Sequence, residues 1–131
     1  MNAGTSGEKR LFALRGAVCC RNDGADITNQ VSILYDDLLR ENGLEEGDIV
    51  SLTFSVTADL DEKNPAAALR QSGRALDAAL FVTAEAPVKG GLPRTIRALL
   101  LCYLDALAVP RHVYRNGAEI LRPDRGGPLT T

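Results

Sequence analysis

The chain has 131 residues, 45% of them hydrophobic and 24% charged, and a formal net charge of −2. This length and composition predict one domain, residues 1–131, with a single core. The slight acidic excess argues against a nucleic-acid partner, which usually contacts a basic face, and no apolar run approaches the roughly 20 residues of a membrane span.

The termini and the cysteines indicate where the protein resides. Residues 1–9 are small and polar without an apolar core, so they do not resemble a signal peptide. We expect a frayed tail there and a second one at the Gly/Pro-rich residues 124–131. Three cysteines, two of them adjacent, give no disulfide framework, which favours a reducing, cytoplasmic location. One histidine, no repeated cysteine spacing, no phosphate loop and no dinucleotide fingerprint predict neither a metal nor a cofactor.

The first half of the chain alternates between strand and helix. Residues 10–20 form the first expected strand, in which Arg15 lies inside an apolar segment. The expected helix that follows ends at Gly43, a typical residue after a helix C-terminus. Its apolar residues recur at steps of three and four: Ile27, Val31, Leu34 and Leu38.

Residues 48–57 give the clearest strand. Apolar side chains alternate there with Ser51, Thr53, Ser55 and Thr57. This second face carries hydroxyls and no charge. Such a face suits packing against another chain, and an ordinary solvated sheet face is an equally good interpretation.

The middle of the chain supplies a short helix and a carboxylate. Pro65 opens a helical turn that includes Arg70 and extends to Ser72. Residues 76–82 are nearly all apolar and predict a strand buried on both faces, which delivers Glu85 at its end.

A second helix is expected at residues 92–107, after the Gly90-Gly91 turn, with Pro93 in its first turn. The interpretation rests on an apolar stripe: Ile96, Leu100, Tyr103, Leu104 and Leu107. Arg97 would lie at the margin of that stripe. A guanidinium at the edge of a buried face needs an anion, from the protein or from a ligand.

The last elements are expected to be a hairpin. Residues 111–115 form one strand, Asn116-Gly117 the turn, and residues 119–121 the returning strand. Together the elements predict an α+β fold with a mixed sheet, helices on one face, one long amphipathic helix, a second helix and a short helical turn.

Four arginines are tied to ordered elements: Arg15, Arg70, Arg97 and Arg122. Guanidinium groups bind carboxylates, so with Glu85, Tyr114 and no evident nucleophile they indicate a small, multiply anionic ligand. Any one arginine taken alone is more often a surface residue or an ion-pair partner. A catalytic triad through His112 is disfavoured because no Gly-x-Ser-x-Gly elbow occurs, and Cys102 is interpreted as a packed residue.

Five motifs in order resemble the trimeric, AroH-class (Bacillus-type) chorismate mutases over about residues 11–124. They are Leu14-Arg15-Gly16-Ala17, Pro65-Ala66-Ala67-Ala68-Leu69-Arg70, Glu85 with Gly90-Gly91-Leu92 and Ile96-Arg97, Arg111-His112-Val113-Tyr114, and Leu121-Arg122-Pro123-Asp124. The resemblance implies a homotrimer with a barrel-like core of sheets and active sites at the subunit interfaces. It also implies the Claisen rearrangement of chorismate to prephenate, in aromatic amino-acid biosynthesis, without cofactor, metal or covalent intermediate.

The resemblance implies a role for each motif residue. Arg97 would donate to the ether oxygen of chorismate, Glu85 would accept from the ring hydroxyl, and Arg15 with Tyr114 would bind the enolpyruvyl carboxylate. Arg70, from the neighbouring subunit, and Arg122 would attract the dianion. The substrate-binding wall would be completed by Asn64, Ala66, Val82 and Leu121.

Three positions depart from the family pattern. Val82 stands where the family usually has cysteine, Asn64 where it has an aromatic residue, and Ala67 where it has lysine. These changes alter the pocket wall and leave open a related substrate, such as isochorismate or an amino-substituted chorismate. The sequence also leaves open a non-catalytic anion-binding trimer and a purely structural assembly unit.

Overall fold

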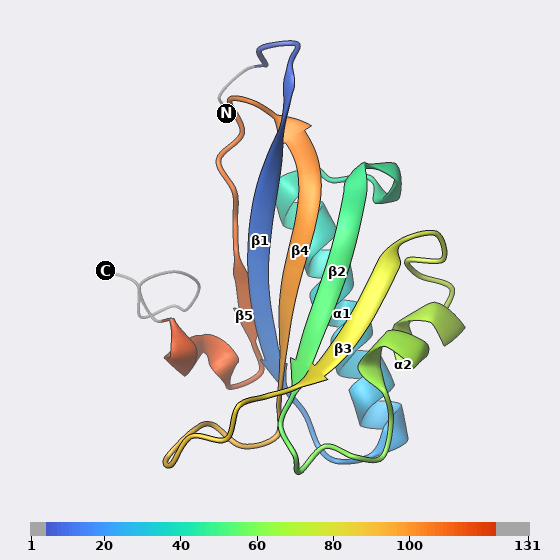
Figure 1. Ribbon diagram of the computed structural model, residues 1–131, viewed down its shortest axis with the longest axis vertical. Coiled ribbons are helices and arrows are strands. Elements are labelled where there is room, and N and C mark those ends of the chain that lie inside the picture. Colours follow the sequence, from blue (N-terminus) through green and yellow to red (C-terminus); the bar gives the residue numbers. More distant parts are fainter. Residues whose placement is uncertain (1–4, 123–131) are drawn as a thin grey trace.

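The computed structural model describes residues 5–122, which form one five-stranded mixed sheet with helices on one side (Figure 1). In chain order the elements are β1 (Lys9–Cys19), α1 (Gly24–Asn42), η1 (Glu46–Asp48), β2 (Ile49–Val56), α2 (Pro65–Gln71), β3 (Ala79–Ala84), β4 (Thr95–Asp105), β5 (Val113–Arg115) and η2 (Ala118–Leu121). The strands lie in the order β3-β2-β4-β1-β5. The α+β prediction is confirmed.

The sheet centre is built from β4 between two antiparallel neighbours. β1 pairs with β4 along its whole length, and β2 pairs with the other edge of β4. The outer strands β3 and β5 are parallel to β2 and β1. Figure 1 shows α1 crossing behind the sheet, and its apolar side Ile27, Val31, Leu34 and Leu38 is almost fully buried. The predicted helix end is confirmed, since Gly43 has a φ of 57° and donates to Arg40 and Leu39.

Gly16 sets how closely α1 approaches the sheet. A Cβ atom at this position would meet the carbonyl oxygen of Val113 at 3.0 Å and the Leu34 side chain at 3.1 Å. We predict that Gly16→Ala destabilises the fold by about 1–3 kcal/mol, because the backbone neighbour cannot move aside cheaply. Thermal unfolding checks this, with Gly24→Ala as the control because nothing lies within 4 Å of a Cβ there. Equal melting temperatures for the two variants would contradict it.

The predicted helix over residues 92–107 is wrong, because the segment forms β4. The side chains buried against α1 are Ile96, Ala98, Leu100, Cys102 and Leu104, a period of two. Ile96, Leu100 and Leu104 also satisfy a helical step of four, so the apolar stripe fitted both structures. The segment pairs with β1 along one edge and with β2 along the other, and this pairing favours a strand over a helix. Arg97 lies on the sheet face opposite those buried side chains.

Two further expectations need correction. The 76–82 strand begins only at Ala79, and its residues are exposed or half-buried rather than buried on both faces, because it is an edge strand. The prediction of a C-terminal hairpin is also wrong. The Asn116-Gly117 turn forms with positive φ at both residues, but it leads into η2, while β5 pairs in parallel with β1.

The N-terminal segment is partly anchored. Ser6 donates from its backbone to the Asp105 carboxylate, the Glu8 carbonyl accepts from Ala106, and Lys9 already belongs to β1. The expected frayed tail therefore does not extend over residues 5–9. The expected tail at residues 124–131 lies outside the described residues. Between residues 5 and 122, no helix is long and apolar enough to cross a membrane.

Neither α1 nor α2 covers the sheet face opposite α1, where η2 packs beside β1 (Figure 1). Four large apolar side chains on it are strongly exposed: Leu11 at 49%, Phe81 at 68%, Leu99 at 45% and Tyr103 at 45%. They share this face with the hydroxyl residues of β2, since Thr53 pairs with Phe81 on one side and with Leu99 on the other. An exposed, largely apolar sheet face of this kind is typical of an interaction surface.

Candidate active site

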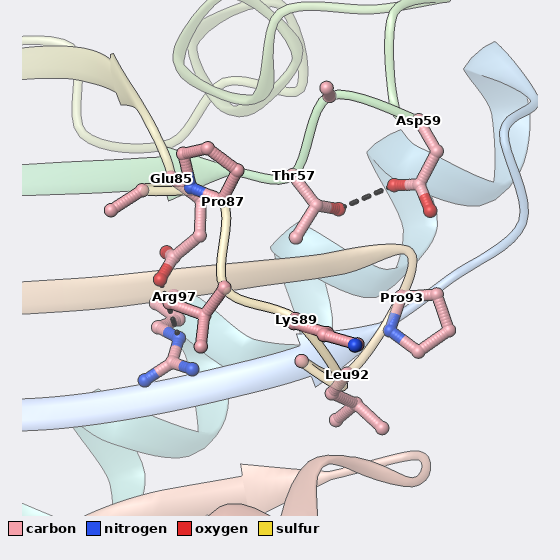
Figure 2. A pocket seen from close by; sticks show the side chains of 12 residues that line it. Thr57, Asp59, Glu85, Pro87, Lys89, Leu92, Pro93 and Arg97 are labelled. Atoms are coloured by element: carbon pink, nitrogen blue, oxygen red, sulfur yellow. Dashed lines mark hydrogen bonds and ion pairs between the residues drawn. The ribbon is translucent and has the colours of Figure 1, made fainter.

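Glu85 and Arg97 lie together at one end of the sheet. Glu85 follows the last residue of β3 and donates from its backbone to the Val56 carbonyl at 2.9 Å. Its Oε2 lies 3.3 Å from Nε of Arg97, and its Oε1 accepts a hydrogen bond from the Ser55 hydroxyl. Figure 2 shows the two charged side chains pointing toward one another. Their side chains are 23% and 41% exposed, so the pair remains accessible to a ligand.

One row of residues across the sheet connects this pair to Tyr114. Arg97 is the cross-strand partner of Ser55 on β2 and of Ala17 on β1, and Ala17 is in turn the partner of Tyr114 on β5. Tyr114 is buried beside Ala17 and Ala118, with Leu92 and Leu121 packed at the edge of the cluster. The predicted residues Glu85, Arg97, Tyr114 and Leu121 therefore come from different segments to the same end of the sheet.

Arg15 lies on the same sheet face, two residues before Ala17, with an exposed side chain. Its backbone N–H donates to Nδ1 of His112 at 2.9 Å, which ties β1 to the start of β5. Arg122 follows η2 directly, and its backbone donates to the Glu119 carbonyl. Both arginines are thus attached to the end of the sheet that carries Tyr114.

A cavity of about 530 Å³ opens beside the Glu85–Arg97 pair. It is lined by Thr57, Ala58, Asp59, Glu85, Ala86, Pro87, Val88, Lys89, Gly91, Leu92, Pro93 and Arg97. Most of this wall is the loop 86–93 between β3 and β4, on which Figure 2 labels Pro87, Lys89, Leu92 and Pro93. The lining combines two carboxylates and two cations with apolar side chains, a surface suited to a small polar anion. Among residues 5–122, no three His, Cys, Asp or Glu side chains are grouped so that they could hold a metal ion.

Asp59 fastens the end of this loop. Its carboxylate accepts from the Thr57 hydroxyl at 2.6 Å and from the backbone N–H of Arg94 at 3.0 Å, and Thr57 in turn accepts from the backbone of Thr95. Arg94 has a φ of 47°, which a non-glycine residue adopts only when its surroundings fix it. The hydrogen bond from Thr57, more than any other contact, holds the pKa of Asp59 below its ordinary value.

The Asp59 contacts predict a pH-dependent stability. Because folding lowers the pKa of Asp59, its contribution is fully present above the ordinary aspartate value of about 3.9 and is lost as pH falls through the lowered one. Asp59→Asn should therefore lower the melting temperature by a few degrees at pH 7 and progressively less below about pH 4. Thermal unfolding from pH 7 to pH 3 measures this, with Glu62→Gln as the control. A deficit independent of pH would contradict it.

A second hollow, of about 280 Å³, contains the other predicted residues. It is lined by Asn64, Ala66, Ala67, Arg70, Leu80, Phe81 and Val82, and it shares no lining residue with the first cavity. Asn64 caps α2, since its side-chain oxygen accepts from the backbones of Ala66 and Ala67. Within one chain, the predicted site residues are therefore split between two separate hollows.

Sequence reasoning did not single out Ser55, Thr57, Asp59 or Lys89. Ser55 and Thr57 were noted only as members of a hydroxyl-bearing strand face. A carboxylate shortly after a strand, as at Asp59, is the one local signal that could have drawn attention to them. Cys102 is confirmed as a packed residue, and burial raises the pKa of its thiol to about 11.

The chain matches the family model described as chorismate mutase type I over residues 11–125. The chain belongs to this family. It is 37% identical over 114 residues to the protein named chorismate mutase AroH of Thermus thermophilus, covering 85% of this chain and 93% of the relative. A solved chorismate mutase from Clostridium thermocellum matches with a TM-score of 0.74 at 35% identity, over 83% of this chain and 98% of the other. The predicted AroH-class resemblance is thus confirmed, and the chain is an isomerase of the chorismate mutase type.

Proposed function

We propose that the chain rearranges chorismate to prephenate in the cavity beside Glu85 and Arg97. The observation that carries this proposal is the way Arg97 is held. Its ion pair with Glu85 is through Nε, and Figure 2 shows the terminal nitrogens of the guanidinium pointing away from Glu85, where an anionic ligand can reach them. A fixed, forked donor beside a cavity suits a dicarboxylate substrate.

The rearrangement needs positioning and electrostatics rather than a nucleophile. The C–O bond of the ether breaks ahead of C–C bond formation, so negative charge develops on the ether oxygen and the ring becomes electron-poor. Arg97 donates to that oxygen, and the Glu85 carboxylate accepts from the ring hydroxyl and faces the electron-poor fragment. Donors already fixed where charge develops lower the barrier by about 3–4 kcal/mol each.

Arg15 and Tyr114 hold the enolpyruvyl carboxylate, and Arg122 attracts the dianion and helps close the site around its compact, chair-like shape. Their common attachment to the β1–β5 end of the sheet supports this role. Holding a flexible dianion in its reactive shape removes much of the entropic part of the barrier. Leu121, packed at the edge of the Tyr114 cluster, forms the apolar side of the proposed substrate site.

A neighbouring copy completes the site in a homotrimer. The hollow that contains Arg70, Asn64, Ala66 and Val82 shares no lining residue with the Glu85–Arg97 cavity in one chain, which supports a site completed across an interface. The exposed apolar face with Phe81 and Leu99 supplies the surface that three copies bury as a barrel-like core. Three free cysteines suit a reducing cytoplasm, where aromatic amino-acid biosynthesis takes place.

The test is the loss of chorismate absorbance with purified protein, with the product identified by acid conversion to phenylpyruvate. Conversion to prephenate, from a particle three times the chain mass by ultracentrifugation, is expected. Isochorismate is the comparison substrate, because Val82, Asn64 and Ala67 alter the pocket wall. Faster turnover of isochorismate would overturn the assignment of chorismate, and turnover by a monomer would overturn the shared site.

A further inference from the structure

We propose that Ser55 is a positioning residue for the rearrangement, which fixes the Glu85 carboxylate and, through it, the Arg97 guanidinium. The inference rests on the proposed function of those two side chains. Ser55 does not line the cavity itself, so its hydroxyl acts on the substrate only by way of Glu85.

Glu85 needs such a partner because of its place in the fold. It follows the end of β3, and the loop after it, residues 86–91, is exposed. Its backbone is held by Val56, but that contact leaves the side-chain torsions free. Within residues 5–122, Oε1 is held by the Ser55 hydroxyl alone and Oε2 by Arg97 alone.

Arg97 depends on the same carboxylate. Its Nε is buried and makes no hydrogen bond within the described chain, and Glu85 compensates its charge through the 3.3 Å ion pair. Loss of the fixed carboxylate would leave the guanidinium without an ion-pair partner at Nε. The terminal nitrogens would then no longer be aimed at one position in the cavity.

Ser55 is suited to this role by its strand. It lies one residue before the end of β2 and is the direct cross-strand partner of Arg97 on β4, the central strand. The donor and the guanidinium therefore rise side by side from paired backbones, while the carboxylate bridges them from the end of β3. A hydrogen bond from a hydroxyl to a charged group is stronger than one between neutral groups.

The test begins with Ser55→Ala. We expect kcat for chorismate to fall about tenfold while KM changes less than about twofold, since the removed contact orients the groups that act in the transition state. Ser55→Thr, which keeps the hydroxyl, should retain most of the activity. The control is Ser51→Ala on the same strand and face, where the hydroxyl makes no hydrogen bond within residues 5–122 and activity should be unchanged.

A double-mutant cycle separates positioning from folding. In a Glu85→Gln background, Ser55→Ala should cost less than about twofold in kcat, because the carboxylate that Ser55 orients is no longer present. An equal loss in both backgrounds, or a loss that Ser55→Thr does not rescue, would overturn the inference, as would wild-type kcat in Ser55→Ala. Failure of the proposed function is a different result, namely a wild-type protein that does not convert chorismate.

Discussion

Arg97→Lys should lower kcat for chorismate by about two to three orders of magnitude although the positive charge is kept. In the structure Nε of the guanidinium faces Glu85, and in the proposed site the terminal nitrogens donate to the ligand. The ammonium of lysine is a compact point charge, so it cannot reproduce the planar fork by which separate nitrogens reach Glu85 and the ether oxygen. Initial rates of chorismate consumption measure the effect.

The control for this prediction is Arg111→Lys. Arg111 contacts Asn42 through its backbone and lines neither hollow, so the same substitution there should leave turnover unchanged. Both variants should melt within a few degrees of the wild type, because the Arg97 side chain is 41% exposed. Near-normal turnover by Arg97→Lys would contradict the role given to the forked donor.

Mixed oligomers of Arg70→Ala and Arg97→Ala should recover activity that neither variant has alone. If each site takes Arg97 from one copy and Arg70 from its neighbour, every mixed trimer has both intact arginines at one site, about a third of its sites. Co-expression of the two variants at equal levels, followed by purification of the doubly tagged oligomer, provides the sample. Its turnover per site should approach that fraction of the wild-type value.

The matched control combines Arg97→Ala with Glu85→Ala. These two residues form one ion pair within a single chain, so no assembly of the two variants contains a site with both intact. Mixing them should restore nothing. Recovery in this control, or no recovery with Arg70→Ala in an oligomer shown to be mixed, would contradict a site shared between copies.

Local signals predicted the first half of the fold because each element there has one clear pattern. The helix that ends at Gly43, the alternating strand β2 and the proline-initiated α2 all appear with nearly the expected bounds. β4 was predicted incorrectly because Ile96, Leu100 and Leu104 fit steps of both two and four. Its pairing with β1, some 80 residues earlier in the chain, decides between them, and no local pattern contains that information.

The candidate site, like the fold, could be predicted only in part from the sequence. Glu85 and Arg97 could be selected from their residue types, and the sequence resemblance named their companions. Their mutual geometry depends on register, since Arg97 meets Glu85 because its cross-strand partner Ser55 on β2 contacts the carboxylate that follows β3. For the same reason Ser55 and Asp59 were not singled out: each acts through a contact made by a different strand or loop.

The most direct measurement is a crystal structure of the protein with a stable bicyclic dicarboxylate that mimics the chair-like rearranging substrate. We expect the ligand to contact Arg97 and Glu85 of one copy and Arg70 of a second copy. One of its carboxylates should lie beside Arg15 and Tyr114. A ligand held entirely within one chain, or bound away from the Glu85–Arg97 pair, would contradict the proposed active site.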